Sequence, residues 1–217
     1  MSGTQLAAMR LDYGQRVFDV ADLASTWHGQ LAHWLAEARD DGVVEPNAMV
    51  LGTVDRHGDP ASRTVLCKGL DPRGIVFYTN FGSAKSGDLR ATPRASATFP
   101  WFSQHRQVHV RGRVEMLGRE ETDAYWRTRP RGSQLGAWAS PQSQQVADRE
   151  SLDATLEAFT RRFAETEYVP LPPNWGGWRV DPDSVEFWQG RSNRMHDRLR
   201  FDADASTGVW TVRRLGP

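Results

Sequence analysis

The stretch "AMVLGTVDRHGDPASRTVLCK", residues 48–68, decides the fold class. Residues 48–55 and residues 61–68 each combine β-branched and other apolar side chains, as strands do. Between them, "RHGD" supplies the glycine and aspartate that are typical of a turn. The stretch therefore predicts two short β-strands joined by a turn.

The rest of the chain continues this pattern of short elements. Further strands are predicted at residues 75–80, 94–101, 106–117, 177–188, 194–201 and 208–214. Helices are predicted at residues 22–40, 84–90, 119–129 and 148–166. Because the helices lie between groups of strands and do not alternate with single strands, the pattern favours a mainly β protein with flanking helices, an α+β fold. It predicts an antiparallel β-barrel and not a parallel sheet.

The first predicted helix carries one apolar stripe in which hydrophobic residues recur every four positions. The members of the stripe are Leu23, Trp27, Leu31 and Leu35. We expect Asp22 to cap this helix and Gly42 to end it. Residues 1–20 are polar and aperiodic and are predicted to form an arm, whereas residues 21–217 are predicted to form a single domain.

The composition excludes several classes of protein. Lys and Arg number 27 and Asp and Glu number 27, so no overall field attracts nucleic acid or a membrane. No signal-peptide pattern is present, and no apolar run approaches the ~20 residues of a membrane span. Together with the single Cys67, this predicts a cytoplasmic protein in a reducing compartment. Nine tryptophans favour an oligomer, because Trp often packs between subunits.

Common catalytic motifs are missing from the sequence. We find no dinucleotide-binding glycine motif, Walker loop, paired-cysteine zinc motif or serine-hydrolase elbow. The six histidines show no metal-ligand spacing, so no metal is predicted. Because no nucleophile stands out either, a bound organic cofactor would have to supply the chemistry.

Two segments combine cations with hydroxyl groups. In "SRTVLCK", Arg63 and Lys68 are five residues apart and would face opposite ways in a regular strand. Either a bulge brings them together, or they bind different anions, or both are surface cations on an edge strand. In "YTNFGSAKSGDLR", Ser83 and Lys85 open a predicted helix, which suits a phosphate but equally suits an ordinary serine cap.

A third segment is "YWRTRPRGSQLGAWASPQS". Tyr125 and Arg129 are four residues apart on one helical face, and Pro130 is expected to end that helix. With Ser133, they provide a phenol, a guanidinium and a hydroxyl that suit a phosphate monoester. The alternative is structural, because an arginine near a helix C-terminus is favourable without any ligand.

The fourth segment, "EFWQGRSNRMHDRLRF", covers residues 186–201. If residues 194–201 form a strand, then Arg194, His196 and Arg198 share one of its faces. Such a face is either solvated or meets an anionic or electron-rich ligand.

Taken together, these segments resemble the pyridoxamine/pyridoxine 5′-phosphate oxidase family of flavin enzymes. The resemblance runs from "MRLDYG" at residue 9 to "RRLGP" at the C-terminus. The matching segments are "RTVLCK", "FYTN", "FPW", "RQVHV", "TRPRGSQLGAWAS", "WGGWRV" and "EFWQGRSNRMHDR". The resemblance implies a split β-barrel that binds FMN and works as a homodimer, with FMN at the subunit interface.

The resemblance also implies two sets of ligand contacts. The FMN contacts would be Arg63, Thr64, Val65, Leu66, Cys67, Lys68, Tyr78, Thr79, Ser83, Lys85, Gln107, Gln142, Ser143, Trp188 and Arg198. The substrate contacts would be Arg10, Tyr13, Lys68, Tyr125, Arg129, Ser133, Arg194 and His196. Among these, Arg194 and His196 would be the catalytic residues beside the flavin. One departure is Ala84, which stands where many relatives have an arginine that helps to hold FMN.

The implied reaction oxidises pyridoxamine or pyridoxine 5′-phosphate to pyridoxal 5′-phosphate by hydride transfer to FMN, with O2 as the electron acceptor and H2O2 as a product. One rival is a flavin or deazaflavin reductase on the same barrel, against which Tyr125, Arg129 and Ser133 argue. The other rival is a non-catalytic module that stores or senses FMN or pyridoxal phosphate, against which the "RMH" segment at 194–196 argues.

Overall fold

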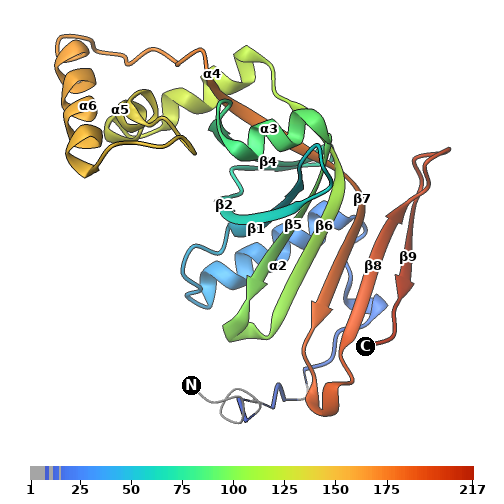
Figure 1. Ribbon diagram of the computed structural model, residues 1–217. Helices are drawn as coiled ribbons and strands as arrows, with labels where there is room; N and C mark the ends of the chain where they lie inside the picture. The colour runs from blue at the N-terminus through green and yellow to red at the C-terminus, as the bar shows by residue number, and fades with distance from the viewer. Residues whose placement is uncertain (1–7, 10–11, 15) are drawn as a thin grey trace. The chain divides into compact units, whose positions relative to one another are not determined.

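The computed structural model describes residues 8–9, 12–14 and 16–217 (Figure 1). The predicted substrate contact Arg10 lies outside these residues. The chain divides into two compact units, which are described one at a time. Unit 1 comprises residues 1–50, 96–111 and 182–217, and unit 2 comprises residues 51–95 and 112–181. The predicted arm at 1–20 and single domain at 21–217 stay predictions.

Nine strands form one hydrogen-bonded sheet in the described part of the chain. They are β1 (Ala48–Val54), β2 (Pro60–Leu66), β3 (Gly69–Asp71), β4 (Gly74–Asn80), β5 (Arg94–Trp101), β6 (Arg106–Met116), β7 (Trp175–Gln189), β8 (Asp197–Ala203) and β9 (Trp210–Arg214). Their order is β2-β1-β5-β6-β7-β4-β3, with β8 beside β7 and β9 beside β8. The pairs β3–β4, β4–β7, β7–β8 and β8–β9 are antiparallel, as the sequence predicts.

The long strand β7 belongs to both units. Its first part pairs with β4, where Trp175 lies opposite Asn80, and its second part pairs with β8, where Gln189 lies opposite Asp197. This continuous strand carries Trp188 near its end.

The four predicted helices are present, two of them several residues shorter than predicted, and one further α-helix appears. The helices are the 3-10 helix η1 (Val20–Asp22), α2 (Trp27–Asp40), α3 (Ala84–Ala91), the 3-10 helix η2 (Phe102–Gln104), α4 (Arg119–Thr128), α5 (Arg131–Ala139), α6 (Arg149–Arg162) and the 3-10 helix η3 (Ser192–Arg194). Helix α5 was not predicted, because Pro130 ends the preceding helix and yet serves as the N-cap of the next one. Among the described helices, none has the length and apolar character needed to cross a membrane.

The prediction that Asp22 caps the first long helix is wrong. Thr26 caps α2, and its Oγ accepts a hydrogen bond from the N–H of Gly29 at 3.2 Å. Asp22 instead belongs to the capping box of η1 with Asp19. The C-terminal end is predicted correctly, since Gly42 follows α2 with a φ of 74°.

The core of each unit is rich in aromatic side chains. In unit 1, Trp34 of α2 packs edge-on against Phe187 of β7, with ring centroids 5.3 Å apart. In unit 2, the buried cluster around Trp126 includes Phe163 and Trp175, and the Trp126 indole N–H donates to a backbone carbonyl. Aromatic packing of this kind gives each unit a rigid base for the side chains that line its pocket.

Candidate active site

A pocket in unit 2, here called the unit 2 pocket, gathers most of the residues that the sequence predicts to bind phosphate groups. Its volume of about 570 Å³ is in the range of small-molecule sites. It is lined by Arg63, Thr64, Val65, Leu66, Lys68, Tyr78, Thr79, Ala84, Lys85, Tyr125, Arg129, Gln142 and Ser143. Apart from Ala84, every one of these was a predicted FMN or substrate contact.

Lys85 is the most unusual group in the unit 2 pocket, because its side chain is buried. Its ammonium donates to Thr79 Oγ1 and Gln142 Oε1, both at 3.1 Å, and to Ser83 Oγ at 3.3 Å. These acceptors are neutral, and burial, followed by the charge of Arg63, lowers the pKa of Lys85. An anion beside Lys85 would offset the cost of burying this charge.

The location of Ser83 decides between the two interpretations of its segment. Ser83 occupies the N-cap position of α3, but its side chain makes no capping hydrogen bond. Its hydroxyl accepts from Lys85 instead, and it is buried behind the residues that line the pocket. Ser83 therefore orients the lysine and is not an ordinary helix cap.

Arg63 and Lys68 line the same pocket, so one cavity can present both cations to one anion or to two. Strand β2 ends at Leu66, and the N–H of Lys68 already donates to the carbonyl of Val76. Strand alternation therefore stops before Lys68. The guanidinium of Arg63 is held by a 2.6 Å hydrogen bond to Thr53 and lies 3.6 Å from Asp88.

A stack of aromatic rings forms another part of the unit 2 pocket. Tyr78 stacks on Tyr125 with centroids 3.9 Å apart, and on its other partner, Trp175, at 5.4 Å. The guanidinium of Arg129 lies 4.6 Å from the Trp175 ring centroid, a cation–π contact. Burial raises the pKa of Tyr78 to about 12, so the phenol remains a hydrogen-bond donor.

Arg129 has donor capacity that the described residues leave unused. Its Nη2 donates to the carbonyl of Ser133 at 2.9 Å, whereas its Nε is buried and has no hydrogen-bond partner among the residues described. Burial lowers the pKa of Arg129 and raises that of Tyr125, with which it shares a side-chain hydrogen bond. An arginine with a buried free donor in a pocket fits an anionic ligand. The side chain of Ser133 does not line the pocket.

Cys67 lies beside this pocket but does not line it. The thiol is buried and donates to the carbonyl of Gly69 at 3.2 Å. Burial raises its pKa to about 11, so the thiol is not a nucleophile at neutral pH.

Unit 1 contains a separate cavity of about 1060 Å³, here called the unit 1 pocket. It is lined by Ala8, Met9, Asp12, Tyr13, Trp188, Arg191, Ser192, Asn193, Arg194 and His196. The predicted residues Tyr13, Trp188, Arg194 and His196 are therefore brought together. The rings of Trp188 and His196 have centroids 4.7 Å apart, and Tyr13 lies 5.8 Å from His196.

Gly190 is required where Tyr13 packs against the end of β7. A Cβ atom at this position would lie 2.8 Å from the Tyr13 ring, 3.0 Å from His105 and 3.1 Å from Trp188. Tyr13 can approach this closely only because the residue has no side chain.

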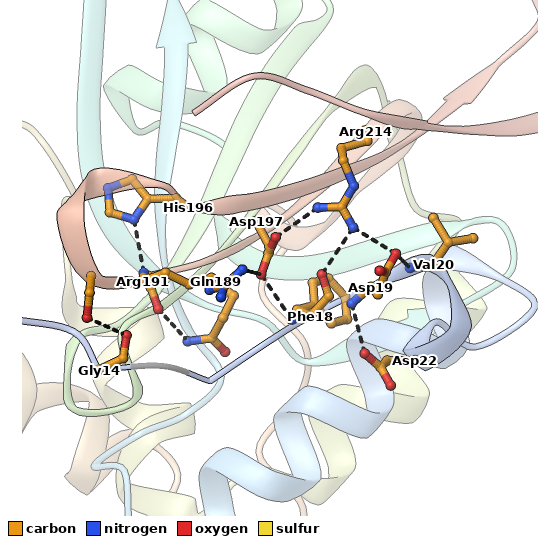
Figure 2. Close-up of polar contacts among 12 residues, drawn as sticks. Gly14, Phe18, Asp19, Val20, Asp22, Gln189, Arg191, His196, Asp197 and Arg214 are labelled. Carbon is orange, nitrogen blue, oxygen red and sulfur yellow. Dashed lines mark hydrogen bonds and ion pairs between the residues drawn. The ribbon is translucent and has the colours of Figure 1, made fainter.

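His196 is held in one tautomer. Its Nδ1 accepts a hydrogen bond of 3.1 Å from the backbone N–H of Arg191, as Figure 2 shows. Burial, followed by the charge of Arg194, lowers the pKa of His196 below its ordinary value of 6.5. The neutral ring therefore carries its proton on Nε2 and can donate it in a hydrogen bond.

The prediction of one strand over residues 194–201 is wrong at its beginning. Strand β8 begins at Asp197, and Arg194 ends the 3-10 helix η3 with a φ of 60°. Strand alternation therefore does not place Arg194, His196 and Arg198 on one face. Only Arg198 of the three lies in the strand, and its guanidinium pairs with Glu186. Neither Arg198 nor Gln107, which is exposed on β6, lines the two pockets described.

The sequence analysis missed three residues that contact predicted site residues or the loop that carries them: Trp175, Glu186 and Asp197. Trp175 begins β7, but prolines and glycines lie close to it in the sequence, so its aromatic side chain gave a weak signal. Asp197 accepts from Phe18, far away in sequence, and Glu186 pairs with Arg198 on the neighbouring strand, so no local pattern identifies either carboxylate.

Comparison with known proteins gives matches to one enzyme family. Residues 35–163 match the family model "Pyridoxamine 5'-phosphate oxidase", and residues 175–217 match "Pyridoxine 5'-phosphate oxidase C-terminal dimerisation region". A pyridoxine/pyridoxamine 5′-phosphate oxidase from Saccharopolyspora erythraea is 58% identical over 213 residues, which cover 98% of this chain and 95% of that protein. One from Mycobacterium sp. strain KMS is 55% identical over 201 residues, covering 90% and 91%.

Solved structures share the fold. PhzG from Burkholderia lata 383, crystallised with tetrahydrophenazine-1-carboxylic acid, has a TM-score of 0.86 and 32% identity, with 94% of this chain and 100% of that chain covered. An FMN-binding protein from Nostoc punctiforme has a TM-score of 0.71 at 20% identity, with 90% and 99% covered, and supports the fold alone. The chain therefore belongs to the pyridoxine/pyridoxamine 5′-phosphate oxidase family of FMN-dependent enzymes, and its antiparallel sheet is the split barrel of that family.

Proposed function

We propose that the protein oxidises pyridoxamine 5′-phosphate and pyridoxine 5′-phosphate to pyridoxal 5′-phosphate, with FMN as cofactor and O2 as the final electron acceptor. The observation that carries the proposal is the unit 2 pocket, which combines four cationic side chains: Arg63, Lys68, Lys85 and Arg129. A flavin mononucleotide and a phosphorylated substrate bring two phosphate groups, and such a pocket suits both.

We assign Lys85 and Arg63 to the FMN phosphate. Lys85 is buried among neutral acceptors in the first turn of α3, so the positive end of the helix dipole adds to its charge. Gln142 and Thr79 fix the ammonium. Ala84 brings no charge to this part of the pocket, and Arg63 is close enough to influence Lys85.

We assign Lys68, Tyr125 and Arg129 to the substrate phosphate. The free Nε of Arg129 and the phenol of Tyr125 offer donors, and Lys68 adds a point charge. Ser133 remains a proposed contact of the substrate phosphate. Its backbone carbonyl accepts a hydrogen bond from Arg129, and its side chain would have to move to reach the phosphate.

Arg194 and His196 would contact the substrate ring beside the flavin, and Tyr13 would cover it. Because residues 175–217 match a dimerisation region, we also propose a homodimer with FMN at the subunit interface. In that arrangement Gln107, Trp188 and Arg198 would reach the flavin. This would explain why they are not among the residues that line the unit 2 pocket.

When bound, FMN supplies the hydride acceptor, and O2 reoxidises it to give H2O2. The residues of the chain bind and orient the substrate and hold protons in place. The Nε2 proton of neutral His196 is available as a hydrogen-bond donor to the substrate ring. No covalent step through Cys67 is needed, in agreement with its raised pKa.

Oxygen consumption with pyridoxamine 5′-phosphate tests the proposal, with unphosphorylated pyridoxamine as the control. We expect turnover only with the phosphorylated amine, H2O2 as product, and FMN on chromatography of heat-released flavin. A flavin or deazaflavin reductase, or a module that only stores FMN or pyridoxal phosphate, would show no oxygen uptake. Bound FAD, or equal turnover of both amines, would contradict the proposed cofactor or phosphate site.

A further inference from the structure

Asp197 is a buried carboxylate that the proposed reaction does not use. It is the first residue of β8, follows His196 directly, and is 6% exposed. A buried carboxylate is stable only when its oxygens are paired or hydrogen-bonded. Its partners therefore show which segments it holds together.

Each partner of Asp197 comes from a different segment of unit 1, as Figure 2 shows. Oδ2 accepts a hydrogen bond of 3.0 Å from the N–H of Phe18, in the N-terminal segment. Oδ1 lies 2.8 Å from Nη1 of Arg214, at the end of β9. Oδ2 also lies 3.6 Å from Nη1 of Arg191, in the loop between β7 and β8.

The contact with Arg191 links Asp197 to the imidazole ring. The side chain of Arg191 faces Asp197, and its backbone N–H donates to Nδ1 of His196. Two contacts therefore hold the loop from Arg191 to Asp197. One is the ion pair between Arg191 and Asp197, and the other is the hydrogen bond from the backbone of Arg191 to the His196 ring. Between these contacts, Asn193 and Arg194 both have left-handed backbone angles, with φ of 57° and 60°. Non-glycine residues keep such angles only when their surroundings hold them.

We propose that Asp197 is a positioning residue for the loop that carries Arg194 and His196. Its charge joins the loop to the N-terminal segment and to β9, and so keeps the His196 ring in the tautomer that has its proton on Nε2. This inference rests on the proposed roles of Arg194 and His196 in pyridoxamine 5′-phosphate oxidation.

The variant Asp197→Asn tests this proposal, because it keeps the shape and removes the charge. Asp19→Asn is the matched control, since Asp19 also lies 2.8 Å from Arg214 but is exposed and does not touch the loop. In the FMN-bound protein we expect Asp197→Asn to lower kcat for pyridoxamine 5′-phosphate at least 10-fold. FMN affinity should change less than threefold, and Asp19→Asn should stay within twofold of wild type in kcat.

Long-range 1H–15N spectra of the imidazoles give a readout that is independent of turnover. The His196 signal, identified by its loss in His196→Gln, should show an unprotonated Nδ1 and a protonated Nε2 in the wild type and in Asp19→Asn. In Asp197→Asn, we expect the two nitrogen shifts to move toward each other as both tautomers become populated. Unchanged shifts, unchanged kcat, or an equal loss of kcat in Asp19→Asn would overturn the proposal.

If Asp197→Asn does not fold, Arg214→Gln takes its place, because it removes one charged partner and leaves the carboxylate with Phe18 and Arg191. We expect the same direction of change in kcat and in the His196 spectrum, and an unchanged spectrum would overturn the proposal. Wild-type protein without oxygen uptake would instead contradict the proposed function. The spectra would then still decide whether Asp197 holds the ring.

Discussion

Arg198 and Glu186 are joined by two side-chain hydrogen bonds, from Nε to Oε1 at 2.7 Å and from Nη2 to Oε2 at 3.1 Å. The residues lie on the paired strands β8 and β7. This double contact fixes the plane of the guanidinium, so Arg198 is preorganised for whatever ligand it meets.

For Arg198→Ala, we expect FMN to bind at least 10-fold more weakly, because a charge-assisted contact contributes about 1.5–3 kcal/mol. Fluorescence titration with FMN measures the change. Arg200→Ala is the matched control, since Arg200 lies two residues along the same strand and pairs with Asp202. Equal losses in the two variants would contradict the assignment of Arg198 to the flavin.

Lys85→Met should lower the affinity for FMN but not the affinity for riboflavin, which lacks the phosphate. The reason is that the buried ammonium has only neutral partners and is assigned to that phosphate. Titration with both flavins gives the selectivity directly. Arg90→Met, at an exposed position near the end of the same helix, should leave the selectivity unchanged. A parallel loss for both flavins would mean that Lys85 only supports the fold.

Arg129→Ala should weaken the binding of pyridoxamine 5′-phosphate by roughly 10- to 150-fold, or about 1.5–3 kcal/mol, and the binding of FMN much less. Steady-state kinetics and FMN titration separate the two effects. The control is Arg127→Ala, because Arg127 is exposed in the last turn of α4, two residues before Arg129, and pairs with Asp123. If FMN and substrate affinities fell together, Arg129 would belong to the other phosphate.

Arg194→Ala and His196→Ala should retain FMN and lose turnover. If these residues orient the substrate against the flavin, kcat/KM should fall by about 10²-fold or more, because small misplacements at a reacting centre are costly. Oxygen-coupled kinetics with FMN titration is the measurement. If Arg194 and His196 instead belong to a solvated basic loop, each substitution should change the measured free energies by no more than about 0.5 kcal/mol.

The pH dependence follows from His196. Its pKa is lowered below 6.5, first by burial and then by Arg194, so the folded protein favours the neutral ring. His196 therefore stabilises the folded protein at pH values above the pKa that this histidine has in the unfolded chain. This stabilisation is lost as the pH falls through the lower pKa of His196 in the folded protein. We expect kcat/KM to fall on the same acidic side. In an NMR titration, Arg194→Gln should move the pKa of His196 upward toward 6.5, and an unchanged value would contradict the role of Arg194.

The strands were predictable wherever local alternation controls burial. Strand β1 is a clear case, because Met49, Leu51 and Thr53 are buried and their neighbours are not. The spacing of Arg63 and Lys68 left their relative orientation open, because an odd–even argument holds only while the strand continues, and β2 ends at Leu66. No local signal marks that end.

The residues that line the unit 2 pocket were predictable from the family resemblance, but their geometry was not. The family resemblance supplied Lys85, Arg129 and His196, whereas the sequence pattern alone left each of their segments ambiguous. The strand predicted from residue 194 failed because tertiary contacts hold Arg194 in a left-handed conformation. Asp197 was missed because its partner Phe18 is 179 residues away in sequence.

The burial of Cys67 also bears on how long the enzyme survives its own reaction. Each proposed turnover releases hydrogen peroxide, which oxidises thiolates much faster than thiols. Because burial raises the pKa of Cys67 to about 11, the group is a neutral thiol at pH 7. Because Cys67 is the single cysteine of the chain, the protein offers hydrogen peroxide no readily oxidised thiolate.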